Sequence, residues 1–497
     1  MDISILEIVL VTPAGQRQHV GHLFRYGSDQ PNGLTRFVPG PDYVRDPERA
    51  TLSLQFVADD ERETQRLLQD IHAAEFNGYR AAPSRTSPAG PLQLPSWFQN
   101  LLPEGAFRAH IAEIRGCAED DFFELLAACG TDLPGAVLAL PVKDASHELM
   151  LELVTERQDA LEVSVTQVPL LEGVSISGVQ PKLGVNEDAR GRYVARTKLE
   201  EATHIIAKLP VVGYPRMPEV EHLSMELASL AGVNACQTRL VPMQALLAPH
   251  QYNLGETDMA RTSFLAVPRY DRDQPGRLHA EDMAQVLGFA PGDKYSRETS
   301  YSLLMQVFLT RESLGEEAVL ELLRRLAVNE LIGNPDCHLK NVGVYYPDGV
   351  NPQLPPAYDI VAHHLYIHAT GHALLILPAP EQKALEDDQR RKFRQRFAKE
   401  HGRELEQGEE GPWSRLLLLQ PTTIKALAER IGLPYKLLDR AASQVVKLAA
   451  ERWPAAIDAS NVTAEQKLRM KAMLERHPAV QALRRRSSAS EPASQAT

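Results

Sequence analysis

The chain has 497 residues, of which 43% are apolar. This composition predicts about two to four folded domains and excludes a chain that is disordered throughout. The net charge of -12, from 53 basic and 65 acidic residues, argues against free-standing nucleic-acid binding, which needs a cationic face. Because no apolar run approaches the ~20 residues of a membrane helix and the cysteines have no paired spacing, we expect a cytoplasmic protein without membrane association.

The first part of the chain predicts a small mixed unit over residues 1–145. Its first 60 residues read as strands, with a hairpin turn at residues 13–15. Apolar residues then recur at helical spacing, and the last of these helices is expected to begin near Asp121 and to end near Gly130. A short buried strand within residues 134–142 closes the unit, and a polar connector follows to about residue 165.

Two further regions and a tail follow. Residues 166–272 alternate strands and turns around one helix, and residues 273–483 are mostly helical, with a helix expected over residues 280–289. Residues 487–497 are polar and predict a disordered tail. A β-rich lobe with one helix, followed by a larger helical lobe, predicts a bilobal α+β fold of the protein-kinase kind.

The loop NPDCHLKN over residues 334–341 carries the most informative polar residues. Phosphoryl transfer needs a carboxylate to orient the attacking hydroxyl and an amide oxygen on Mg²⁺, and the kinase template places these residues five positions apart. Asp336 and Asn341 have this spacing. Lys340 could meet the transferred phosphate, and His338 would orient the loop. The alternative is a solvated turn before a strand.

A second carboxylate for the metal is expected after the strand that follows such a loop. Asp359, in the sequence Tyr358-Asp359-Ile360, lies 23 residues after Asp336. The alternative is an aspartate that caps the next turn.

A lysine and a glycine-containing segment could bind the nucleotide. Lys208 ends an apolar strand and would need a buried partner, for which Glu221 or Glu226 on the next helix is available. The alternative is an edge-strand lysine that reaches water. Three glycines within residues 173–184 predict a hairpin-like turn that could approach phosphates, although an ordinary hairpin has the same pattern.

These motifs, in this order, resemble the HipA family of serine/threonine kinase toxins along the whole chain. The segments that carry the resemblance are FQNLLPEGAFRAHIAEI, LLAACGTDLPGAVLALP, SISGVQPK, THIIAKLP, VEHLSMELASLAG, VPRYDRD, NPDCHLKN and YDI. The resemblance implies an ATP- and Mg²⁺-dependent protein kinase.

The resemblance also implies individual roles. Asp336 would be the catalytic base, and Asn341 and Asp359 would hold Mg²⁺. Ser175 would be the autophosphorylated residue, with Ser177 as a second candidate, and the added charge would repel ATP and switch the kinase off. The implied nucleotide-binding residues are Lys208, Glu221, Ser177, Gly178, Val179, Gln180, Pro268, Arg269, Tyr270, His338 and Lys340.

Members of this family phosphorylate aminoacyl-tRNA synthetases and bind a helix-turn-helix antitoxin of the HipB kind, which would do most of the DNA reading. The basic stretch 389–403 could touch DNA phosphates in such a complex, but the favoured alternative is a solvated helix face with acidic residues nearby. Two other functions stay open. The Asp336 motif also resembles that of aminoglycoside and choline phosphotransferases, and a non-catalytic antitoxin-binding co-repressor would keep the same partners.

Overall fold

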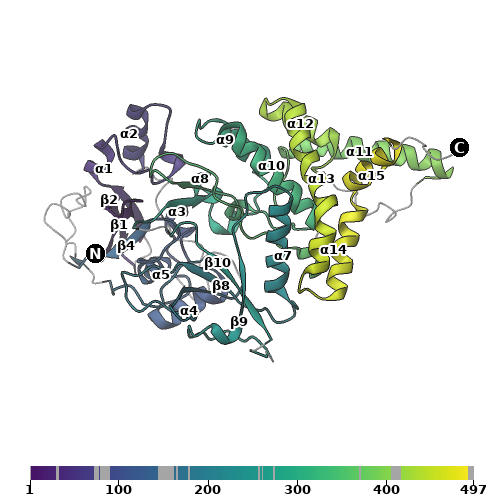
Figure 1. The fold of residues 1–497 in the computed structure, drawn as a ribbon. Helices are drawn as coiled ribbons and strands as arrows, with labels where there is room; N and C mark the ends of the chain where they lie inside the picture. The colour runs from purple at the N-terminus through teal and green to yellow at the C-terminus, as the bar shows by residue number, and fades with distance from the viewer. Residues whose placement is uncertain are drawn as a thin grey trace. The chain divides into compact units, whose positions relative to one another are not determined.

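The computed structural model describes residues 2–28, 33–71, 78, 90–143, 162–163, 166–176, 180–255, 258–259, 261–272, 275–368, 371–404 and 416–490. The chain forms two compact units, each built from several segments (Figure 1). Unit 1 comprises Met1–Val212, Val241–Lys294 and Gly343–Pro355, and unit 2 comprises Gly213–Leu240, Tyr295–Val342 and Pro356–Thr497. Within the described residues, every helix is too short or too polar to cross a bilayer.

Unit 1 begins with a sheet in the order β3-β2-β1-β4, with β5 parallel to β1. Its antiparallel β1–β2 pair is the predicted hairpin, closed by a hydrogen bond of 2.8 Å from the amide of Thr12 to the carbonyl of Gln16. The strands are β1 (Asp2–Val11), β2 (Arg17–Tyr26), β3 (Leu34–Pro39), β4 (Val137–Pro141) and β5 (Glu162–Val163).

Helices share a core with this first sheet. They are α1 (Pro41–Arg45), α2 (Glu61–Asp70), α3 (Ser96–Gln99), α4 (Gly105–Arg115) and α5 (Phe122–Cys129). Helix α5 begins and ends as predicted, because the Asp121 carboxylate accepts from the amide of Glu124 and Gly130 is the C-cap. The core also contains Val174 and Ile176, so part of the expected nucleotide loop is buried here.

A second sheet of unit 1 has the order β7-β6-β8-β10-β9. Its strands are β6 (Lys182–Glu187), β7 (Tyr193–Val194), β8 (Ile205–Lys208), β9 (Arg239–Pro242) and β10 (Ser263–Pro268). In the middle strand, Lys208 stands opposite Lys182 on one side and Leu265 on the other. The backbone around Lys208 is therefore fixed by both neighbours.

A third pairing corrects the helix expected over residues 280–289. Strand β11 (His279–Asp282) pairs with β12 (Gly343–Tyr346), and only α8 (Met283–Val286) is helical. Asp282 ends the strand and starts the helix, since its side chain forms a capping box with Gln285. The local pattern could not reveal the partner strand, which lies about 60 residues away along the chain.

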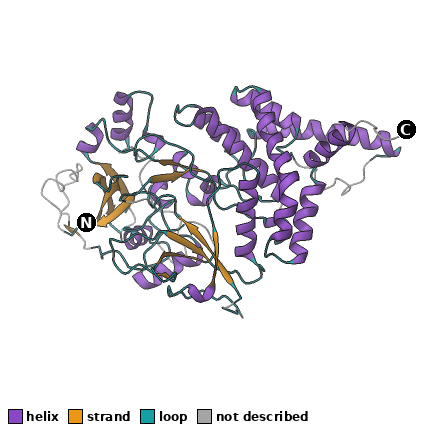
Figure 2. Ribbon diagram, in the orientation of Figure 1, coloured by secondary structure: helices purple, strands orange, loops and turns teal. Residues whose placement is uncertain are grey.

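Unit 2 is almost entirely helical (Figure 2). Its helices are α7 (Met217–Leu230), α9 (Tyr301–Leu309), α10 (Gly315–Ile332), α11 (Ala379–His401), α12 (Pro421–Ile431), α13 (Tyr435–Ala459), α14 (Ala464–Arg476) and α15 (Pro478–Ser490). Helix α10 packs against α9, α13, α14 and α7. Helix α7, which the sequence places with the β-rich lobe, thus groups with unit 2.

The expected disordered tail over residues 487–497 is only partly within the described residues. Helix α15 continues through Ser490, so the first four residues of this segment are helical. Residues 491–497 lie outside the described residues.

Candidate functional site

The loop that follows α10 in unit 2 is anchored at its first two residues. Gly333 has φ 68, and a side chain there would collide with His364, so the helix must end at glycine. Asn334 then donates from Nδ2 to Oδ1 of Asn329 (2.8 Å) and accepts from the amide of Asp336 (3.1 Å). The asparagine side chain therefore links the last turn of α10 to the candidate base.

Asp336 and Asn341 lie together in this loop. The carbonyl of Asp336 accepts from Nδ2 of Asn341 (2.8 Å) and from the amide of His338 (2.9 Å). A short 3₁₀ turn over Leu339–Asn341 closes the loop before β12. The hydrogen bond from Nδ2 of Asn341 to the carbonyl of Asp336 fixes the Asn341 side chain and turns its amide oxygen away from the Asp336 backbone.

Tyr295 contacts the side chain of Asp336 and was not foreseen from the sequence. Its hydroxyl donates to Oδ1 of Asp336 at 2.5 Å, and its ring packs edge-on against His338, with centroids 5.0 Å apart. Asp336 is half-buried and Tyr295 is 45% exposed. The donor is neutral, so the carboxylate is oriented without being neutralised.

The segment that contains Asp359 is tied to the same loop. The hydroxyl of Tyr358 donates to the carbonyl of Lys340 (3.1 Å). Next to it, Ala357 exchanges backbone hydrogen bonds with residues after α7, at 2.7 Å to Asn234 and 2.8 Å to Cys236. Asp359 itself has φ 60, a strained conformation for a residue other than glycine that is typical of functional sites.

The charges of Asp336 and Asp359 both affect the pKa of the buried Cys337 thiol. Burial raises the pKa of the Cys337 thiol to about 12, and the negative charges of Asp336 and Asp359 both act to raise it. Both aspartates therefore lie within electrostatic reach of Cys337. The carboxylate of Asp359 and the amide oxygen of Asn341 are ligands of the kind Mg²⁺ prefers, and a magnesium site at these two residues stays a prediction.

The expected nucleotide-binding residues are distributed over both units. Lys208 is only 7% exposed on the central strand β8, so the alternative of an edge-strand lysine that reaches water is wrong. On α7, Glu221 is 1% exposed whereas Glu226 is exposed. Of the two partners proposed for the lysine, only Glu221 is therefore buried. His338 and Lys340 are also buried.

Residues 173–176 differ from the expected hairpin. Ser175 is 1% exposed, its hydroxyl donates to the carbonyl of Leu101, and its amide donates to the carbonyl of Asp132 at 3.0 Å. Residues 173–176 form no strand, because Val174 and Ile176 pack into the first core instead. Ser177, Gly178 and Val179 lie outside the described residues, and Gln180 donates to the carbonyl of Leu209 (3.4 Å).

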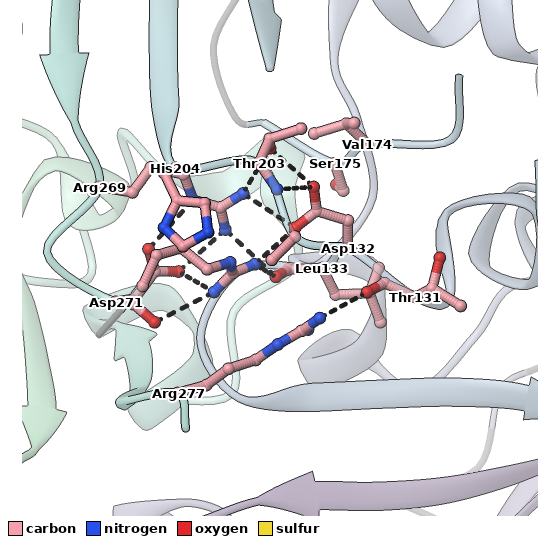
Figure 3. Close-up of polar contacts among 12 residues, drawn as sticks. Thr131, Asp132, Leu133, Val174, Ser175, Thr203, His204, Arg269, Asp271 and Arg277 are labelled. Carbon is pink, nitrogen blue, oxygen red and sulfur yellow. Dashed lines mark hydrogen bonds and ion pairs between the residues drawn. The ribbon is translucent and has the colours of Figure 1, made fainter. Parts of the chain in front are cut away.

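The segment Pro268–Tyr270, which the resemblance implies binds the nucleotide, joins a buried charge cluster through Arg269 (Figure 3). The amide of Arg269 donates to the carbonyl of His204 (2.8 Å). Its guanidinium pairs with Asp132 (3.1 Å) and Asp271 (2.9 Å). The Arg269 side chain is thus committed to ion pairs, while the Tyr270 ring packs edge-on against Tyr345.

Asp132 is the centre of this charge cluster. It pairs with Arg272 at 2.8 Å and accepts from the amide (3.0 Å) and hydroxyl (2.7 Å) of Thr203. Burial alone would raise the pKa of Asp132, but the charges of Arg269 and Arg272 outweigh it and hold the pKa well below its usual value. The cluster connects three segments of unit 1 that are distant in sequence, at Asp132, at Thr203 and at residues 269–272. Sequence reasoning missed it because no local motif connects them.

The basic stretch 389–403 lies on α11 and the residues just after it. Asp388 pairs with Arg391 and, at 2.6 Å, with Lys392, which agrees with a solvated helix face. The contact of this stretch with DNA stays a prediction.

Comparison with protein families matches both parts of the chain. Residues 174–453 match the HipA-like C-terminal domain, and residues 14–140 match the HipA N-terminal domain. A Sinorhizobium fredii protein named "Putative kinase Y4dM" is 32% identical over 347 residues, which cover 69% of this chain and 76% of that protein. The serine/threonine-protein kinase toxin HipA of Shewanella oneidensis is 26% identical over 301 residues, 55% of this chain and 64% of the toxin.

A solved structure shows the same fold. It is that of Shewanella oneidensis HipA in complex with HipB and operator DNA, with a TM-score of 0.58 and 18% identity. The match covers 97% of this chain and 99% of that one. The bilobal, kinase-like α+β fold predicted from the sequence is thereby confirmed.

Proposed function

Because the chain belongs to the HipA family, we propose that it is an ATP- and Mg²⁺-dependent serine/threonine protein kinase that acts as the toxin of a toxin–antitoxin pair. The observation that carries the proposal is the loop after α10. There, Asp336 and Asn341 are hydrogen-bonded to each other, and the Asp359 segment is tied to the loop through Tyr358.

The polar residues of the loop and of its surroundings have separate roles in the proposed phosphoryl transfer. Asp336 orients the acceptor hydroxyl and takes its proton, while Tyr295 holds the orientation of the Asp336 carboxylate. Asn341 and Asp359 hold Mg²⁺, which when bound neutralises charge on the phosphates of ATP. Lys208 and Lys340 supply positive charge toward the same phosphates, with Glu221 as the partner of Lys208.

We also propose that Ser175 is phosphorylated by the kinase itself. Its burial means that the segment must leave the first core before it can react, which exposes Val174 and Ile176. A phosphate carries about -1.5 to -2 charges and cannot return to an apolar core without a large desolvation cost. Autophosphorylation would therefore keep the nucleotide loop displaced and switch the kinase off.

The partners follow from the family and from the charge of the chain. We propose a helix-turn-helix antitoxin of the HipB kind, which is the partner in the Shewanella complex, and DNA contact only through that antitoxin, because this chain has net charge -12. An aminoacyl-tRNA synthetase is the proposed acceptor, as the family resemblance implies.

Incubation of the purified chain with Mg²⁺, labelled ATP and a cell lysate tests the proposal. We expect label on one large protein of the lysate and on the chain itself, with phosphopeptides mapping to Ser175 and lost in Ser175→Ala. As a matched control, Ser460→Ala at the end of α13 should keep full labelling. Label in small molecules alone would indicate a small-molecule kinase, and failure to bind ATP at millimolar concentration would indicate a non-catalytic co-repressor.

A further inference from the structure

We propose that unit 1 contains a second ligand site, a pocket beside the charge cluster that binds a phosphomonoester through Arg277. This site lies wholly within unit 1 and does not depend on the kinase proposal.

The pocket has a volume of about 920 Å³, enough for a small organic ligand. Its polar lining includes Arg17, Thr131, His204, Arg272 and Arg277. The carboxylates of the cluster, Asp132 and Asp271, do not line it. Two of the three arginines of the cluster, Arg272 and Arg277, therefore line the pocket, whereas Arg269 and the two aspartates do not.

Arg277 is the member of the cluster whose charge is least compensated. Its Nη2 donates to the carbonyl of Thr131 at 2.9 Å, whereas Nη1 is buried and makes no hydrogen bond within the described part of the chain. The residue is 8% exposed. In Figure 3 it extends toward Thr131, apart from both aspartates, so a guanidinium that is more than nine-tenths buried and has an unpartnered Nη1 lies at the pocket wall.

The charge balance of the cluster is also incomplete. Arg269 and Arg272 already share the two carboxylates of Asp132 and Asp271, so Arg277 adds a third buried cation. Burial and the charge of Arg272 together lower the pKa of Arg277 to about 9, although the charge of Asp132 acts to raise it. An anion in the pocket would supply the missing negative charge and a partner for Nη1.

The backbone that presents Arg277 is built for close packing. At Gly276, an added Cβ would lie 2.0 Å from the carbonyl oxygen of Thr12 and 2.5 Å from that of Pro13. Only glycine allows the segment to lie this close to the β1–β2 turn. Arg277 therefore has a fixed position, which lowers the entropic cost of binding a ligand.

Phosphate is the anion that fits this donor. A guanidinium matches the oxygens of a phosphate with two parallel N–H donors. Glu187, Glu200 and Glu201 line the same pocket and would repel a second anionic group. The ligand class is therefore a phosphomonoester whose remainder is neutral or cationic, either a free metabolite or a phosphorylated residue of a basic peptide.

Calorimetric titration of the full chain, without nucleotide or magnesium, tests this site. The probes are inorganic phosphate, glycerol phosphate, a lysine-containing phosphoserine peptide and pyrophosphate. We expect saturable binding of the phosphomonoesters, weaker binding of pyrophosphate, and a loss of about tenfold or more in affinity for Arg277→Gln. Tighter binding of the peptide than of glycerol phosphate identifies a protein ligand, and the reverse identifies a metabolite.

Thermal unfolding shows whether Arg277→Gln is folded, so that a loss of phosphate binding can be distinguished from a loss of structure. In phosphate-free buffer Arg277→Gln should be at least as stable as the wild type, because it removes an uncompensated buried cation, and phosphate should stabilise only the wild type. Arg192→Gln, which removes an exposed pair with Asp188, should keep the phosphate response. Equal phosphate affinity in wild type and Arg277→Gln, or no saturable binding to the wild type, overturns the proposal.

Discussion

The charge cluster around Asp132 in unit 1 and the loop around Asp336 in unit 2 use carboxylates in opposite ways. Asp132 is fully buried and pairs with two arginines. Asp336 is half-buried, and the contact described for its carboxylate is the neutral hydroxyl of Tyr295. The charge of Asp132 is balanced by arginines within the fold. The carboxylate of Asp336 is half-buried and is held by a neutral hydroxyl.

The difference distinguishes a structural carboxylate from one that can react. A buried ion pair stabilises only while both partners are present, so removing one leaves an uncompensated charge. A carboxylate that is held by neutral donors keeps its charge for a ligand or a proton. Substitution of Asp132 should therefore change stability, and substitution of Asp336 should change activity.

The largest effect is expected for Asp336→Asn. Loss of the general base should lower the rate of phosphate transfer by about 10²–10⁴-fold, while the midpoint of thermal unfolding stays unchanged because Asn can still accept from Tyr295. Transfer rates with labelled ATP, together with unfolding scans, check this. Asp348→Asn, in an exposed turn, is the control. Wild-type activity in Asp336→Asn would show that another group is the base.

Asp132→Asn should instead destabilise the fold by about 3–5 kcal/mol, because Arg269 and Arg272 lose one of the two carboxylates that they share and their buried charge is no longer balanced. Urea unfolding measures the loss. The exposed pair of Asp188 and Arg192 provides the control, since Asp188→Asn should have only a small effect. A small change in Asp132→Asn would mean that the arginines find other partners.

The pH dependence of stability extends the comparison to two buried glutamates. In unit 2, burial alone would raise the pKa of Glu330, but the neighbouring imidazoles of His372 (2.9 Å) and His477 (3.3 Å) outweigh it and lower the pKa to about 2. Glu330 therefore stabilises the fold above its unfolded pKa of about 4.5, and this contribution is lost as the pH falls toward 2. Glu330→Gln should cost about 3 kcal/mol at pH 7 and less below pH 4.

Glu281 in unit 1 should behave in the opposite way. Burial raises its pKa, although Ser53, Trp97 and Tyr346 donate to its carboxylate. Its protonated form is favoured in the fold, so its contribution is present at low pH and is lost as the pH rises through the raised pKa. Glu281→Gln should therefore be tolerated better at pH 7 than Glu330→Gln. Urea unfolding of both variants at pH 7 and below pH 4 checks this. If Glu281→Gln lost more stability at pH 7 than Glu330→Gln, the explanation would be contradicted.

The smallest effect is expected for Tyr295→Phe. Loss of the hydroxyl removes one hydrogen bond to the Asp336 carboxylate and should lower kcat roughly tenfold, with little change in the KM for ATP. Tyr435→Phe is the control, because its hydroxyl also donates to an aspartate, Asp439, but far along the chain from the loop. A change in KM alone would show that Tyr295 acts on nucleotide binding.

Local patterns predicted much of the fold and of the loop. The hairpin at β1–β2, the ends of α5 and the placement of Asp336 beside Asn341 all depend on residues that are close in sequence. The Asp132 cluster joins residues about 140 positions apart, and the strand β11 depends on a distant partner. These features could not be read from the sequence, because no local periodicity or spacing encodes a tertiary contact.

We propose that Asp359 and Asn341 hold the magnesium that accompanies ATP. Calorimetric titration of ATP with and without Mg²⁺, in the wild type and in Asp359→Asn, tests it most directly, since asparagine tolerates the φ of 60 at this position. We predict that Mg²⁺ strengthens ATP binding to the wild type and has little effect on the variant. An equal effect of Mg²⁺ on both proteins would contradict the claim.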